Sequence, residues 1–137
     1  MTDAPVPPEV RALLFDRIDT FEELEVLVFL HSAPGRSFTA HDIAETLRLP
    51  LDGASAALQG LVSHSLIEAD KGRSSTKFRF DPRAERAAAV EALARCWSTQ
   101  RYEVARLLGT YAMERVRNSA ARAFADAFVI GRRKKDG

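Results

Sequence analysis

The sequence predicts a mainly α-helical protein with one small β-hairpin and a helical extension at its C-terminal end. Between residues 21 and 62, apolar residues recur at three- and four-residue spacing, which is the period of an amphipathic helix. Between 66 and 80 the pattern changes to alternation on either side of a glycine-containing turn, which is typical of a hairpin. From 83 onward the chain contains no proline and is rich in alanine, arginine and glutamate, which favours long helices.

The 137 residues divide into three predicted segments. Residues 1–20 form an N-terminal arm and a short helix, 21–82 the domain that carries the hairpin, and 83–137 a C-terminal helical region that ends in the basic run Arg132–Lys135. Hydrophobic residues make up 46% of the chain, which is enough for a core without metals or disulfides.

Composition also excludes several classes of protein. The formal net charge of +1 does not mark the whole surface as nucleic-acid-binding, so any electrostatic argument must be local. The single cysteine, Cys96, cannot form an intramolecular disulfide, which fits a reducing cytoplasm. No run of 18 apolar residues and no signal-peptide pattern occurs, so we expect a cytoplasmic protein without a membrane partner.

Capping residues and chain breakers place the helices of the first two segments. Pro8 can begin a helix that runs to about residue 18, and Thr20 can cap the next one, which should end near Pro34. Thr39 with Asp42 three residues later resembles a capping box for a further helix, and Asp52 is expected to cap the helix after it.

Between and after these helices the pattern favours extended chain. Residues 36–38 are predicted as one short strand, and residues 66–69 and 77–80 as the two strands of the hairpin. Phe78 and Phe80 alternate with Lys77 and Arg79, as expected of a strand with one buried face.

Helix, short strand, helix, turn, helix, hairpin is the order of elements in a winged helix-turn-helix. Residues 21–82 resemble the winged-helix transcriptional regulators of bacteria, in the broad MarR/PadR-like sense. The resemblance lies in SFTAHDIAETLRLP (37–50), LDGASAALQGLVSHSLIEA (51–69) and KGRSSTKFRF (71–80). It implies a winged helix-turn-helix fold and a regulator that binds double-stranded DNA with its third helix in the major groove.

The third helix of this domain departs from that pattern. A helix that reads base edges needs arginine, lysine, asparagine or glutamine on its outer face, and residues 52–65 contain no lysine or arginine. The remaining candidates are Ser55, Gln59 and Ser63, of which Gln59 can pair with adenine and Ser55 can reach a phosphate.

The hairpin carries the positive charge that the third helix lacks. Lys71, Arg73, Lys77 and Arg79 surround its glycine-containing tip. Such a tip suits contact with phosphates, which is independent of base sequence and sensitive to salt. We therefore expect the wing, with the basic tail, to supply phosphate contacts.

A second function remains open at this stage. The neutral third helix is also compatible with a winged-helix protein–protein interaction module, an adaptor or sequestering factor without sequence-specific DNA binding. Small residues such as Gly53, Ala56 and Gly60 would let the backbone of another protein approach closely.

The C-terminal region is predicted to form a homodimer. Its apolar residues fall on three- and four-residue spacing over about three heptads if Gln100 occupies one place in the seam, and a further helix is expected over 114–128. The premise is that the small core of one chain cannot cover all of these side chains. The predicted dimerisation residues are Val90, Leu93, Trp97, Val104, Leu108, Tyr111, Phe124 and Phe128.

No pattern for catalysis, for a metal or for a cofactor is present. His31, His41 and His64 are scattered along the chain without a metal-ligand motif such as HExxH, and neither a phosphate-binding loop nor a nucleophile elbow occurs. Cys96 adjoins Trp97 in the apolar seam, where a buried inert thiol is favoured over a redox sensor. We therefore expect a protein that is not an enzyme.

Overall fold

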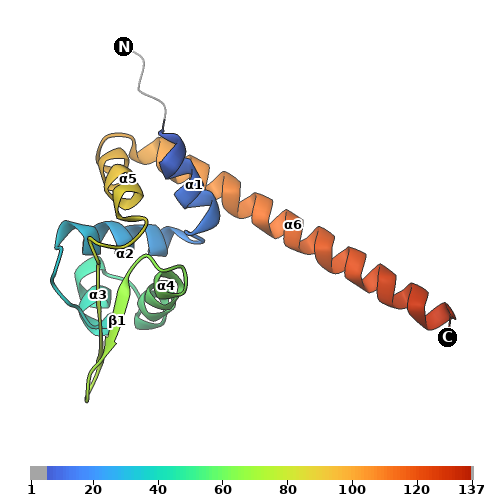
Figure 1. The fold of residues 1–137 in the computed structure, drawn as a ribbon, viewed down its shortest axis with the longest axis horizontal. Helices are drawn as coiled ribbons and strands as arrows, with labels where there is room; N and C mark the ends of the chain where they lie inside the picture. Colours follow the sequence, from blue (N-terminus) through green and yellow to red (C-terminus); the bar gives the residue numbers. More distant parts are fainter. Residues whose placement is uncertain (1–5, 137) are drawn as a thin grey trace, which may run out of the picture.

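The computed structural model describes residues 6–136, with side chains described as far as residue 127. It contains a row of helices interrupted by one two-stranded antiparallel sheet (Figure 1). The elements are α1 (Pro8–Asp16), α2 (Phe21–Ser32), α3 (Ala40–Leu47), α4 (Leu51–Ser63), β1 (Glu68–Lys71), β2 (Thr76–Arg79), α5 (Ala87–Thr99) and α6 (Arg101–Asp136).

Helix α2 forms the centre of the structure, as its nearly continuous apolar sequence predicts. Thr20 caps it by accepting a hydrogen bond from the Glu23 backbone N–H at 3.1 Å. Leu24, Leu27 and Leu30 are fully buried between α4 on one side and α5 on the other. The helix ends at the cap Ala33, directly before the Pro34 breaker.

Helices α3 and α4 form the predicted helix-turn-helix. The capping box at α3 is confirmed, because Thr39 Oγ1 accepts from the Asp42 N–H at 3.1 Å and Asp42 Oδ2 accepts from the Thr39 N–H at 3.0 Å. Asp52 does not cap α4: the helix begins two residues earlier than that cap implies, at Leu51, with Pro50 at the cap position and Asp52 in the first turn. A proline fits there because it lacks the N–H that a helix start leaves unpaired.

The hairpin is confirmed, with β1 and β2 paired from Glu68 opposite Arg79 to Lys71 opposite Thr76. Leu66 and Ile67, expected in the first strand, are buried just before it. The strand expected at 36–38 is reduced to one bridge, in which Phe38 and Phe78 exchange backbone hydrogen bonds of 2.9 and 2.7 Å.

The C-terminal region differs from the prediction in where its helices break. The expected continuous seam is interrupted at Gln100, and α6 then continues without a break through the boundary predicted near residue 113. Ser98 and Thr99 are weak helix formers, and the Thr99 hydroxyl donates to the Arg95 carbonyl at 3.1 Å. Residues 112–114, Ala-Met-Glu, are strong helix formers and give no reason to stop.

The break at Gln100 changes the role of the predicted dimer seam. It folds α5 and the start of α6 back onto α1 and α2, so one buried cluster draws on all three predicted segments. The premise that one chain cannot cover its seam is therefore wrong for five of its six residues. Val90, Leu93, Trp97, Val104 and Leu108 are all buried inside the chain's own core.

The other three predicted dimerisation residues lie outside this core. Tyr111 is half-buried, with its ring edge-on to Phe15 at 5.3 Å between ring centres. Phe124 is 74% exposed on the part of α6 that projects away from the body of the molecule (Figure 1). Phe128 and the basic run Arg132–Lys135 belong to α6, and their side chains lie outside the described residues.

Candidate nucleic-acid interface

The side chains in the middle of the outer face of α4 are small and uncharged. Ala54, Ala57, Leu58 and Leu61 are buried against α2 and α3, which turns the remaining positions outward. Gln59 lies exposed on that outer face, and its amide makes no hydrogen bond within the part of the chain that the structure describes. Its donor and its acceptor are therefore available to a base edge.

The two predicted serines are less available than Gln59. Ser55 is half-buried. Ser63 is exposed, but its hydroxyl donates to the Gly60 carbonyl at 2.7 Å, so only its acceptor lone pairs remain. Of the three predicted residues on α4, Gln59 alone combines exposure with an uncommitted donor.

The wing carries three exposed cations that have no ion-pair partner among the described residues: Lys71, Arg73 and Lys77. The fourth predicted cation is committed, because Arg79 donates from Nε and Nη2 to Glu68 Oε2 at 3.0 and 2.7 Å. These two residues face each other across the hairpin, so their pairing follows from the register. The charge available for phosphates is therefore concentrated toward the tip.

A close approach of the backbone shapes that tip. The Gly72 N–H donates to the Ser75 carbonyl at 3.0 Å, and a Cβ at Gly72 would lie 2.8 Å from the same oxygen. A side chain at position 72 would therefore push the two arms of the turn apart. The hairpin extends beyond α3 and α4 in Figure 1, so its tip is the outermost part of the domain on that side.

A further cation, which the sequence pattern did not single out, lies in the turn of the helix-turn-helix. Arg48 ends α3 in the left-handed conformation, with φ of 55°, and is exposed just before α4 begins. The N-terminal end of a recognition helix is the part that meets base edges and nearby phosphates. Counting charge within α4 alone hides this residue, whereas a count that includes the turn finds it.

A row of exposed apolar residues lies on α6 beyond its contact with α1. Met113, Val116 and Phe124 are 67%, 70% and 74% exposed. With Ala120 and Ala127 they recur at three- and four-residue spacing, which places them on one side of the helix. None of the five residues of this stripe, the α6 stripe, belongs to the hydrophobic core or is among the partly buried residues that pack against it.

The thiol of Cys96 shows no sign of a chemical role. Cys96 is buried on α5, and burial raises the pKa of its thiol. A thiol with a raised pKa stays protonated at neutral pH and is a poor nucleophile.

No helix in the described part of the chain is both long and apolar enough to cross a membrane.

Helix-turn-helix, wing and flanking helices together define a winged-helix fold. The sequence matches no family model and no characterised protein. Among solved structures, the adhesin competence repressor AdcR from Streptococcus pyogenes is similar, with 17% identity, a TM-score of 0.50 and coverage of 87% of this chain and 91% of that one.

Two structures of another regulator are also similar. MepR, a transcription regulator of the Staphylococcus aureus multidrug efflux pump MepA, has 18% identity, a TM-score of 0.50 and coverage of 87% of this chain and 90% of that chain. A MepR variant bound to an oligodeoxyribonucleotide has 16% identity with the same TM-score and coverage. At these identities the likeness concerns the fold.

Proposed function

We propose that this protein is a DNA-binding transcriptional regulator that acts as a homodimer. The observation that carries the proposal is the exposure of Gln59 on the outer face of α4. It is joined by a cation in the turn before that helix, Arg48, and by a wing whose tip carries cations with no ion-pair partner among the described residues. The similar structures add support, because AdcR is described as a repressor and MepR as a transcription regulator, with one MepR variant bound to an oligodeoxyribonucleotide.

The two parts of this surface divide the work of binding. Lys71, Arg73 and Lys77 neutralise phosphates and release counterions, which gives affinity for any duplex and a strong dependence on salt. The amide of Gln59 can make a bidentate contact with adenine, worth about 1–3 kcal/mol of discrimination against another base. Affinity thus comes mainly from the wing and base preference mainly from α4.

The α6 stripe is the proposed dimer contact. Covering it with the same helix of a second copy would bury Val116 and Phe124 in a two-fold interface. The predominance of small residues between them allows two helices to approach closely. Two copies would then present two α4 helices to a DNA site with matching symmetry.

A protein-interaction module remains the alternative function, favoured by the neutral outer face of α4. A cation in the turn before that helix, Arg48, weighs against it, because this charge together with the basic tip of the wing is better suited to phosphate than to an uncharged protein surface.

Removing charge from the wing tests the proposal. We expect Arg73→Ala with Lys77→Ala to weaken binding to every duplex alike and to reduce the slope of log K against log salt by about one for each phosphate that the variant no longer neutralises. The measurement is fluorescence anisotropy with labelled duplexes at several salt concentrations.

The matched control removes two exposed cations at the opposite end of the domain. Arg11→Ala with Arg95→Ala, on α1 and α5, changes the net charge equally. It should leave the salt slope as it is in the wild type. Equal loss of affinity in both double variants would mean that net charge alone, and no built surface, attracts the DNA, and it would contradict the proposal.

A further inference from the structure

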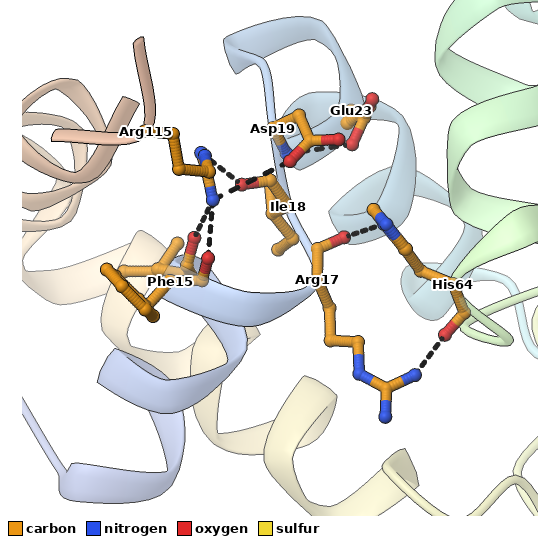
Figure 2. Close-up of polar contacts among 8 residues, drawn as sticks. Phe15, Arg17, Ile18, Asp19, Glu23, His64 and Arg115 are labelled. Carbon is orange, nitrogen blue, oxygen red and sulfur yellow. Dashed lines mark hydrogen bonds and ion pairs between the residues drawn. The ribbon is translucent and has the colours of Figure 1, made fainter. Parts of the chain in front are cut away.

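Two carboxylates near the start of α2 meet a histidine that is distant in the sequence where the loop after α1 passes the end of α4. One carboxylate oxygen of Asp19, one of Glu23 and a ring nitrogen of His64 all lie within 4.8 Å of one another. Asp19 lies in the loop, Glu23 in the first turn of α2 and His64 at the C-terminal cap of α4 (Figure 2). Sequence spacing could not find this group, because its histidine comes from another helix.

The imidazole of His64 is held in one tautomer. Its Nδ1 lies 2.6 Å from the Arg17 carbonyl oxygen, which can only accept, so Nδ1 carries the proton and donates it. Arg17 returns the contact, because its Nη1 donates to the His64 carbonyl at 3.0 Å (Figure 2). In the neutral ring the lone pair is then on Nε2. Histidines that bind metals are oriented in this way, with the other ring N–H donated to a carbonyl.

Glu23 is a largely buried carboxylate with one oxygen that makes no hydrogen bond to the described chain. It is 5% exposed, and Oε1 accepts one hydrogen bond, from the Asp19 N–H at 2.9 Å. Oε2 has no hydrogen bond to any described residue. Burial raises the pKa of Glu23, and the nearby Asp19 carboxylate raises it further. The hydrogen bond from the Asp19 N–H and the charge of Arg115 lower this pKa without offsetting the loss of water.

Helix α4 has space for the Oε2 atom of Glu23 because residue 60 is a glycine. A Cβ at Gly60 would lie 2.5 Å from Glu23 Oε2, closer than real Cβ atoms come to such a neighbour. The absence of a side chain at Gly60 therefore keeps the carboxylate in place beneath α4. No buried side-chain oxygen of the described residues lacks a hydrogen bond, so Oε2, which has none, keeps contact with solvent. An oxygen that is held in position without a protein partner is available to a cation from solution.

We propose that Asp19, Glu23 and His64 bind a divalent metal ion of the zinc class. One imidazole with two carboxylates suits Zn²⁺ and its first-row neighbours, whereas Mg²⁺ and Ca²⁺ prefer six or more oxygens. Zinc bonds of about 2.0–2.2 Å in tetrahedral geometry place ligand atoms about 3.3–3.6 Å apart. Pairs that lie near the 4.8 Å limit must therefore close by about 1.2–1.5 Å through rotation of the side chains. Water completes the coordination.

Arg115 is the cation that lies beside the carboxylates of this group. Its Nη1 lies 3.6 Å from Asp19 Oδ1, and its guanidinium also donates to the carbonyls of Phe15 and Ile18 (Figure 2). These carbonyl contacts hold Arg115 at the end of α1 when the metal binds. Its charge lowers the affinity for a metal, because the cation and the metal compete for the Asp19 carboxylate.

The site connects the loop after α1 with the end of α4, so metal binding would fix how α4 sits on α2. This regulatory consequence rests on the proposed function, because a fixed α4 would change affinity for DNA. Metal binding itself does not depend on that function. The two are therefore measured separately.

Calorimetric titration of the full-length, tag-free chain with ZnSO₄ after chelator treatment tests the site. We expect one zinc ion per chain. Asp19→Asn, Glu23→Gln and His64→Asn each remove a ligand while keeping the local hydrogen bonds, since Gln keeps an acceptor for the Asp19 N–H and Asn a donor for the Arg17 carbonyl. Each should weaken zinc binding at least tenfold, the least that loss of a supporting partner costs.

His41→Asn is the control. His41 Nε2 lies 3.4 Å from Glu45 in an exposed pair on α3, the kind of surface pair that collects zinc without a built site. Loss of zinc binding in His41→Asn with binding retained in the cluster variants would overturn the proposal, and so would a wild type that binds no zinc.

Thermal unfolding gives a second readout that does not need the variants. Zinc at well above its Kd should raise the Tm of the wild type, while the same concentration of Mg²⁺ should not. An equal rise with Mg²⁺ would overturn the assignment to the zinc class. Anisotropy with DNA, with and without zinc, then tests regulation, and unchanged affinity would overturn that role alone.

Discussion

At the scale of single residues, Gly60 and Glu23 show how closely α4 lies on α2. The carboxylate of Glu23 bonds to the Asp19 N–H in the loop before α2, and its second oxygen lies where a side chain at Gly60 would be. The two positions therefore depend on each other. Nothing in the sequence pattern indicates this, because a glycine in a helix has the same appearance whether it faces solvent or a buried carboxylate.

A pair of glycines on the same helix turns this contact into a prediction. In Gly60→Ala the new methyl group displaces Glu23 and breaks its hydrogen bond, whereas a Cβ at Gly53 would meet only Pro50 Cδ at 3.9 Å. Alanine is a better helix former than glycine by about 1 kcal/mol at both sites. We therefore expect Gly53→Ala to stabilise the protein, and Gly60→Ala to be less stable than Gly53→Ala by about 1–2 kcal/mol.

Denaturant unfolding of both variants gives the two free energies of unfolding on one scale. Equal stability of the two alanine variants would show that Glu23 moves aside without loss, and would contradict the close approach of Gly60 to Glu23.

At the scale of elements, local signals predicted those parts of the fold that local chemistry determines. The Thr39–Asp42 capping box and the alternation around Phe78 were sufficient for α3 and for the hairpin. The break at Gln100 could not be predicted in the same way. Apolar residues at helical spacing look identical whether they face a second chain or their own core, and only the fold shows that α1 and α2 cover Leu93 and Val104.

The candidate interface was predictable to a similar degree. The exposure of Gln59 follows from its position on the helix, and the charge of the wing follows from its residue types. The pairing of Arg79 with Glu68 depends on the hairpin register, which residue composition does not reveal. Likewise, Asp19 and His64 come together only because the loop after α1 crosses the end of α4.

The α6 stripe yields a prediction about assembly. Val116→Asp with Phe124→Asp places two charges in the proposed interface, where they would be buried without partners. We expect a dimeric wild type and a monomeric double variant in sedimentation experiments at tens of micromolar. The fold of the monomer should persist, because both side chains are exposed in the single chain.

Two positions on the opposite side of the same helix provide the control. Asn118→Asp with Ala125→Asp adds similar charge to exposed sites about half a turn away from the stripe. This variant should remain dimeric. A wild type that sediments as a monomer would refute the dimer.

At the scale of the whole molecule, one core holds the helix-turn-helix, the wing and the start of α6 together. Helix α1 packs against both α5 and α6, and Arg115 of α6 donates to carbonyls at the end of α1. The next residues along the chain, 17–19, contact the end of α4 and the group around Glu23. A change in how α6 packs against a second copy would therefore be transmitted to α4 through α1 and residues 17–19.

Selection of sequences from a random duplex library tests the central claim, that α4 of a dimer reads DNA, most directly. We predict that the wild type enriches a two-fold symmetric sequence with half-sites about one helical turn apart. Gln59→Ala should lose up to about a hundredfold of that preference, with little change in affinity for random duplexes. Enrichment of no sequence by the wild type, at salt concentrations where it still binds duplex DNA, would contradict the claim.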